Sequence, residues 1–143
     1  MAAALLAVLL GVPCMIKDGL PDHDCTPGQA TTATVDEICH RHTRTARHVS
    51  DKTKRLIAEL YGTPEDEVVE IDHLVPLELG GSNGLTNLWP QPAEPRPGYH
   101  EKDLLENRLH RLVCAGKMPL AEAQAQIAKD WIALYFRLFP SPP

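Results

Sequence analysis

Asp72 and His73 stand side by side in the sequence, and Asn87 follows them across a glycine-rich turn. These residue types suit the hydrolysis of an anionic ester. A phosphodiester repels nucleophiles, so a divalent cation must neutralise charge on its oxygens while a general base takes a proton from the attacking water. Histidine suits the second role because its ordinary pKa lies near neutral pH. We therefore take Asp72 as a candidate metal ligand and His73 as a candidate base.

The two side chains can share a cleft only if their strand ends or bulges there, because successive residues of a strand face opposite sides. A β-branched run predicts a strand over residues 67–74, and residues 85–88 return after the turn to give an irregular hairpin. Asn87 lies on the returning segment. We expect it to pin the loop and to help orient the ring of His73.

A helix is predicted over residues 99–115, because apolar side chains recur there at the spacing of one helical face. His100 lies at its start and is the candidate for the second metal ligand. Asp103 and Asn107 share the face of His100 and are alternative ligands or substrate contacts.

The central stretch resembles the core motif of the HNH endonuclease family, which has a ββα-metal fold; the matching residues are Asp72-His73-x-x-Pro76-Leu77-x-x-Gly80-Gly81-Ser82-Asn83-x-x-x-Asn87-Leu88. The resemblance implies that Asp72 and His100 hold a divalent cation, with Mg²⁺ expected and Mn²⁺ or Zn²⁺ as alternatives. It also implies that His73 is the base and that Asn87 has a structural role. Enzymes of this family cleave DNA and leave 5′-phosphates.

The chain departs from the family pattern in two respects. The interval from Asn87 to His100 is longer than usual and contains a proline-rich connector at residues 91–98, and the flanking cysteine pairs that bind zinc in many members are absent. A looser similarity links the chain to small exported bacterial proteins with an HNH-like domain, through Asp18-Gly19-Leu20-Pro21 and Leu105-Glu106-Asn107-Arg108-Leu109-His110-Arg111-Leu112-Val113-Cys114.

The charge pattern limits how a nucleic acid could bind. The net charge is -5 with His neutral, so contact with phosphates needs a local basic patch or a metal. Residues 40–55 hold six basic side chains and one acid, which predicts either a strip along the DNA backbone or a solvated charged face. The substrate-binding candidates are Arg44, Arg47, Arg96 and Lys102.

The N-terminal residues 1–13 are mostly apolar and too short to span a bilayer, and their length fits a secretory signal. A buried helix and a lipid anchor at Cys14 are the alternatives. An even number of cysteines behind a signal indicates disulfides, for which four cysteines allow three connectivities. We expect Cys39 to pair with Cys114.

The remaining segments complete an α+β fold, a ββα-metal hairpin and helix with flanking helices packed around it. Residues 14–49 are expected to form an extended arm with a short helix at 35–39 and an extended piece at 43–47. The HNH-like domain is expected over residues 50–139, with helices at 51–61 and 120–138, and residues 140–143 form a tail.

These observations predict an exported, metal-dependent HNH-like endonuclease that contacts the DNA backbone, with no stable membrane span in the mature chain. One alternative is a catalytically degenerate HNH-fold protein that binds nucleic acid or another partner. A second alternative is a disulfide-tied envelope protein without a role in nucleic-acid chemistry.

Overall fold

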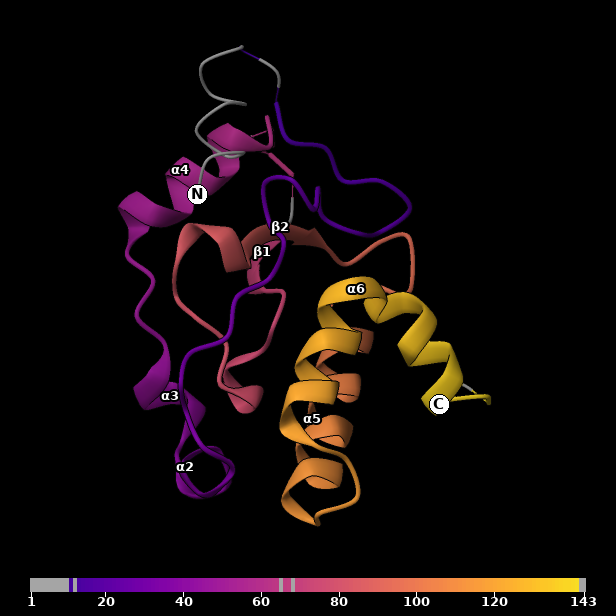
Figure 1. The fold of residues 1–143 in the computed structure, drawn as a ribbon. Helices are drawn as coiled ribbons and strands as arrows, with labels where there is room; N and C mark the ends of the chain where they lie inside the picture. Colours follow the sequence, from indigo (N-terminus) through magenta and orange to yellow (C-terminus); the bar gives the residue numbers. More distant parts are fainter. Residues whose placement is uncertain (1–10, 12, 65, 68, 142–143) are drawn as a thin grey trace.

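Two short antiparallel strands, β1 (Val69–His73) and β2 (Leu88–Pro92), form the hairpin around which the other elements are arranged (Figure 1). In their register Asp72 lies opposite Trp89 and His73 opposite Leu88. The structure is a computed structural model, and it describes the chain except for residues 1–10, 12, 65, 68 and 142–143. The predicted signal at residues 1–13 therefore lies almost wholly outside the described residues.

The long loop of the hairpin contains two single-turn helices, η1 (Leu77–Leu79) and η2 (Leu85–Asn87). The glycine pair between them is required by the backbone. Gly80 has a φ of 75°, which L side chains rarely adopt, and a Cβ at Gly81 would collide with the carbonyl of Val75. The Gly-Gly pair of the sequence motif is thus explained by a tight chain reversal beneath the end of β1.

Five helices surround the hairpin in the described part of the chain: α2 (Val35–His40), α3 (Thr43–Ala46), α4 (Asp51–Leu60), α5 (Tyr99–Cys114) and α6 (Leu120–Leu138). Local sequence sets several of their ends. The hydroxyls of Thr34 and Ser50 accept backbone N–H bonds as N-caps of α2 and α4. Gly116 follows α5 with a φ of 69° and ends that helix.

The core lies where α5 and α6 pack side by side against the hairpin loop, on the right of Figure 1. The two helices present apolar stripes to one another and to the loop, and the indole rings of Trp89 and Trp131 are both fully buried. The principal core side chains are Ile38, Leu74, Val75, Leu79, Trp89, Leu105, Leu109, Val113, Ala123, Ile127, Trp131, Leu134 and Tyr135.

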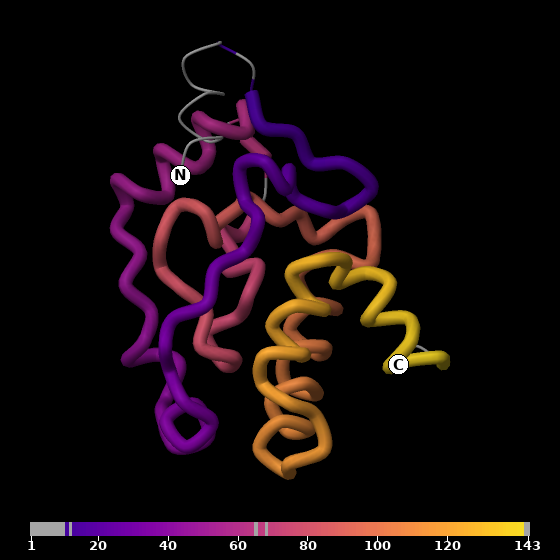
Figure 2. The backbone as a smooth tube through the Cα atoms, in the orientation of Figure 1, coloured from indigo at the N-terminus to yellow at the C-terminus, as the bar shows by residue number. Residues whose placement is uncertain are grey.

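The N-terminal arm runs along the hairpin from the end of α4 to α2, as the indigo tube in Figure 2 shows. Backbone hydrogen bonds fix its path. Cys14 N donates to Leu60 O at 2.8 Å, and Thr31 N donates to Gly80 O at 2.8 Å. In the opposite direction, from the loop to the arm, Ser82 N donates to Gln29 O at 2.8 Å. The arm therefore braces the loop of the hairpin as well as the helices.

The α+β class and the helices predicted near residues 35–39, 51–61, 99–115 and 120–138 are confirmed. The extended piece predicted at 43–47 is wrong, because this segment forms the short helix α3. Its alternating pattern is not that of a strand with one buried face; instead Arg47 N bonds Thr43 O at 3.1 Å and closes a helical turn.

The returning strand was also predicted too early. Residues 85–87 form η2, and β2 extends through Leu88–Pro92 into the segment predicted to be a connector. The prolines mislead because Pro90 and Pro92 are tolerated in this two-stranded hairpin, where each strand has a free edge. No helix in the described part of the chain is long and apolar enough to cross a membrane.

Two disulfides cross-link the described chain. Cys39–Cys114 ties α2 to the end of α5, as predicted, and Cys14–Cys25 closes a short loop within the arm. The two bridges fit a protein that matures in an oxidising compartment. Their sequence separations are 75 and 11 residues, so they constrain the unfolded chain to different extents.

Replacing both cysteines of the longer bridge, Cys39→Ser with Cys114→Ser, is expected to lower the free energy of unfolding by about 4 kcal/mol. The matching pair Cys14→Ser with Cys25→Ser is expected to cost about 3 kcal/mol, because it opens a shorter loop. Denaturant unfolding of both double variants measures the difference. A larger loss at the short bridge would contradict the loop-closure explanation.

Candidate functional site

Asp72 and His73 line one cleft of about 200 Å³ between the end of β1, α3 and α5. Asp72 and His73 are the last two residues of β1, and both line this cleft where the strand ends. Both are buried, with 8% and 2% of their surface exposed. The full lining is Thr43, Arg44, Arg47, Glu70, Asp72, His73, Pro76, Leu77, Glu78, Asp103 and Glu106.

The ring of His73 is oriented by Asn83. The His73 Nε2 lies 3.0 Å from Asn83 Oδ1. The direction of that amide is set by two other contacts: Asn83 Nδ2 donates to Ala46 O at 2.9 Å, and Oδ1 accepts from His48 N at 3.1 Å. Since Oδ1 can only accept, His73 must carry its proton on Nε2 when neutral, which leaves the Nδ1 lone pair free.

The environment of His73 favours its neutral form. Burial lowers the pKa of His73, and this outweighs the Asn83 hydrogen bond and the charge of Asp72, which raise it. No hydrogen bond to Nδ1 is formed by any residue that the structure describes. His73 thus presents an unprotonated nitrogen at a cleft, which is the state that a general base requires.

Asn87 holds the shape of the loop and does not touch the His73 ring. Its Oδ1 accepts from Val75 N at 2.9 Å and from Gln29 N at 3.0 Å. Its Nδ2 donates to Val75 O at 2.9 Å and to Ser82 O at 2.8 Å. These four hydrogen bonds hold the loop in place, which is the role predicted for Asn87. The ring of His73 is instead oriented by Asn83, a residue of the motif to which the sequence assigned no role.

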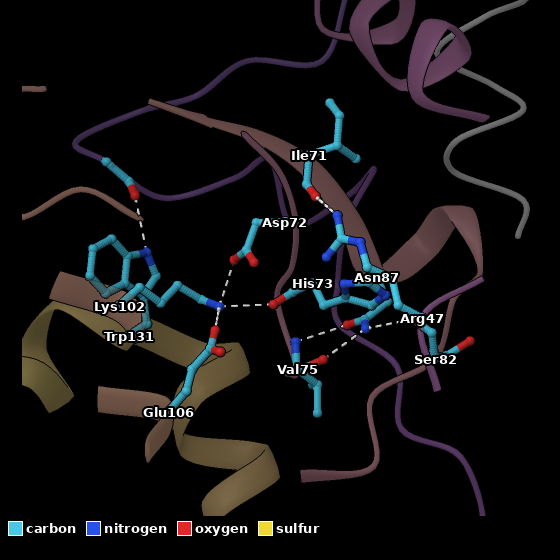
Figure 3. Close-up of polar contacts among 11 residues, drawn as sticks. Arg47, Ile71, Asp72, His73, Val75, Ser82, Asn87, Lys102, Glu106 and Trp131 are labelled. Atoms are coloured by element: carbon cyan, nitrogen blue, oxygen red, sulfur yellow. Dashed lines mark hydrogen bonds and ion pairs between the residues drawn. The ribbon is translucent and has the colours of Figure 1, made fainter. Parts of the chain in front are cut away.

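Lys102 is fully buried beneath the cleft, and its ammonium joins the hairpin to α5 (Figure 3). Its Nζ donates to Asp72 Oδ2 at 2.7 Å, to His73 O at 2.8 Å and to Glu106 Oε1 at 2.5 Å. Burial lowers the pKa of Lys102, but the two carboxylates raise it by more, so the ammonium stays charged. The prediction that Lys102 contacts substrate is wrong, because all three of its donors are already used.

The cleft carries more negative charge than its cations neutralise. Five carboxyl groups line it, against Arg44, Arg47 and the underlying Lys102, so the formal charge has two negative charges in excess, while burial raises the pKa of Glu106 to about 8. Burial raises the pKa of Glu70 and of Asp103, and the nearby Asp72 raises both further. These shifts indicate carboxylates that are crowded together without full compensation, the condition that a bound cation would relieve.

The other predicted residues divide into two groups. Arg44 and Arg47 line the cleft, and Arg47 also donates to Ile71 O at 2.8 Å. Arg96 and His100 do not line it. Arg96 pairs with Glu101 at the start of α5, with Nε to Oε1 at 2.7 Å.

His100 is exposed and lies against the ring of Tyr99, with 4.4 Å between ring centroids, so it is not brought together with Asp72. The connector sets α5 in a register that places Lys102 at Asp72 and leaves His100 outside the cleft. Asp103, the alternative ligand, does line the cleft, and Asn107 instead donates to Asp103 O within the helix at 2.9 Å.

No protein-family model, curated protein or solved structure matches this chain. Among the described residues, the one group of three potential ligands with closely spaced atoms lies elsewhere, at Cys39, His110 and Cys114. The cleft carboxylates are thus not assembled as a closed cage, but magnesium sites commonly use one or two carboxylates with water.

Lys102→Met is expected to lower the free energy of unfolding by about 3–5 kcal/mol, because it leaves Asp72 and Glu106 buried without their shared cation. Adding Asp72→Asn and Glu106→Gln to that variant is expected to restore part of the loss. The exposed control Lys54→Met should change stability by less than about 0.5 kcal/mol. Denaturant unfolding measures all three, and equal losses for Lys102→Met and Lys54→Met would remove the buried-ammonium explanation.

Proposed function

We propose that this protein is a metal-dependent endonuclease of the HNH type, which hydrolyses phosphodiester bonds in DNA with His73 as the general base. One observation carries the proposal: His73 offers an unprotonated Nδ1 at a charged cleft while Asn83 fixes its other nitrogen. A histidine that served only packing would need neither a fixed tautomer nor a free nitrogen at a cleft. The motif that contains both residues supports the same assignment.

The donor set of the cleft fits a hard divalent cation. Asp72 keeps one oxygen that Lys102 does not use, and the crowded carboxylates of Glu70 and Asp103 lie in the same cleft. One or two of these carboxylates would hold Mg²⁺ together with water, in place of the predicted pair of Asp72 and His100. When bound, the cation would neutralise charge on the phosphate.

The protein residues have separate tasks in this proposal. His73 Nδ1 takes the proton from the attacking water, and the Asn83 amide keeps the ring from turning. Arg44 on α3 and Arg47, the residue that follows α3, line the cleft, where they would contact the phosphates on either side of the scissile bond without reading bases. We further propose that the chain acts after export, which the two disulfides support.

A second candidate is favoured by one contact. Lys102 Nζ already occupies one oxygen of Asp72, the residue expected to bind the metal, at 2.7 Å. An ammonium at this position could stand in for a cation and leave an HNH-like fold that binds nucleic acid or another partner without cleaving it. The two candidates differ in whether a divalent ion changes the state of a DNA substrate.

His73→Ala is expected to abolish the nicking of supercoiled plasmid in Mg²⁺, because no other side chain of the described cleft offers a neutral imidazole nitrogen. Asn83→Ala is expected to slow nicking by about 10- to 100-fold, since an unfixed ring spends less time in the productive tautomer. EDTA should stop the wild-type reaction, and Mg²⁺ or Mn²⁺ should restore it.

His100→Ala is the matched control for the replaced histidine, because His100 is exposed and outside the cleft. It should nick plasmid as fast as the wild type. Nicking by His73→Ala at the wild-type rate would exclude His73 as the base. DNA binding without any metal-dependent nicking in the wild type would instead favour the non-catalytic candidate.

Arg44→Ala with Arg47→Ala is expected to raise the DNA concentration for half-maximal nicking and to flatten its dependence on salt by about two phosphate contacts. Arg96→Ala is the control, since its guanidinium lies outside the cleft. Rates measured against DNA concentration at several salt concentrations test this. An equal effect of Arg96→Ala would show that general positive charge, and not the cleft, sets the affinity.

A further inference from the structure

Outside the cleft, three side chains suited to a soft metal ion lie close together. Cys39 lies near the end of α2, and His110 and Cys114 lie on the last two turns of α5. One ligand atom from each, two Sγ atoms and an imidazole nitrogen, fall within 4.8 Å of one another. Thiolates with imidazole are the ligand set that zinc favours in closed protein sites.

The helix supplies two of the three ligands in a fixed relation. His110 and Cys114 are four residues apart on α5, so their side chains lie on the same face. Cys114 Sγ is 3.6 Å from His110 Nε2. Tetrahedral zinc with ordinary bond lengths places a sulfur and a nitrogen ligand about 3.6 Å apart, so this edge of a zinc site is already present.

The sulfurs are the atoms that must move. Cys39 and Cys114 form a disulfide, whereas two thiolates on one zinc ion lie about 3.8 Å apart. Their Cα atoms are 5.8 Å apart, and side-chain rotation can open the sulfur separation without moving the helices. Cys114 is exposed and the other two side chains are half-buried, so a reductant and a metal ion can reach the group.

His110 is held in place by the backbone of α2. Its Nε2 lies 3.1 Å from Ile38 O, next to Cys39 in the sequence. In the oxidised protein this nitrogen can donate its proton to that carbonyl. In the tautomer with the proton on Nδ1, the same nitrogen carries a lone pair and lies 3.6 Å from Cys114 Sγ. The contact therefore holds the ring beside the two cysteines before any metal arrives.

We propose that Cys39, His110 and Cys114 form a zinc site when their disulfide is reduced, so that the same side chains join α2 to α5 in either redox state. A dithiol supplies two electrons and two protons to the disulfide and is itself oxidised to a disulfide, which leaves two thiols on the protein. Zn²⁺ then binds the two sulfurs and His110 Nε2 with loss of the two thiol protons, and water completes the tetrahedron.

The site has a structural consequence for a chain made in a reducing compartment and used in an oxidising one. Before the disulfide forms, α2 would be tied to α5 by packing around Ile38 and by the contact of His110 with Ile38 O. Zinc would hold the ends together in the interval, with its ligands already placed for oxidation. This proposal does not rest on the endonuclease, because the group lies outside the residues that line the cleft.

The test uses Co²⁺ as a spectroscopic probe and the full chain. The protein is reduced with a phosphine, which converts each disulfide to two thiols, is itself oxidised to the phosphine oxide with an oxygen atom from water, and competes weakly for metal. Reduced wild type is expected to bind one Co²⁺ with a thiolate-to-cobalt charge-transfer band, and Zn²⁺ should displace it. The oxidised protein should show no such band, because a disulfide supplies no thiolate.

Two variants locate the site. His110→Gln keeps an N–H that can bond Ile38 O but removes the imidazole, and it should weaken Co²⁺ binding by more than about tenfold, since loss of even an outer partner of a metal ligand costs that much. Cys14→Ser with Cys25→Ser removes the other thiol pair and should leave the band unchanged. Zn²⁺ should also raise the melting temperature of the reduced wild type but not of His110→Gln.

Three results would overturn the proposal. One is the absence of a charge-transfer band in the reduced wild type. Another is a band and a melting temperature that respond to metal equally in wild type and His110→Gln. The last is a band that disappears in Cys14→Ser with Cys25→Ser, which would place the thiolates in the arm.

Discussion

The buried ammonium of Lys102 is the interaction on which the site depends. It donates hydrogen bonds to one carboxylate oxygen of Asp72, to the carbonyl of His73 and to one carboxylate oxygen of Glu106, so it fixes the end of β1 against α5. Removing an ammonium from water is costly, and only the two carboxylates make this burial favourable. The acidic character of the cleft follows, because its carboxylates are present partly to keep this charge inside.

Two asparagines divide the work of shaping the cleft. Asn87 is fully buried and uses both ends of its amide on backbone groups, which holds the loop and the arm in one conformation. Asn83 bonds a catalytic side chain candidate directly and is itself held by the segment that contains α3. One amide sets the path of the chain, and the other sets the tautomer of a single ring.

The sequence was sufficient for the parts of the fold that depend on local patterns. Caps at Thr34 and Ser50 and the stripes of α5 and α6 are signals within one helix, and the structure has those helices. Asp72 and His73 could be found because they are adjacent in a motif. The Cys39–Cys114 pairing was a choice among three connectivities that the sequence left open, and the structure has it.

The rest depended on register between distant segments, which no local pattern fixes. A lysine two residues after His100 gives no sign in the sequence that it will be buried, because lysine is almost always a surface residue. Only the path of the proline-rich connector decides that Lys102 and not His100 meets Asp72. Asn83 was equally hard to assign, since its partners Ala46 and His48 lie on an unexpected helical turn and its flank.

Under the proposed function, the contacts of Asn83 would couple the binding of substrate by the arginine segment to the orientation of the His73 base. The amide that holds His73 is anchored to Ala46 and His48, on either side of Arg47, so the arginine segment cannot shift without disturbing the imidazole. A nucleic acid that binds the Arg47 segment in a well-ordered position would therefore hold the His73 ring in place, and one that binds it loosely would let the ring move. Discrimination between substrates would then appear in turnover, even among substrates held with equal affinity.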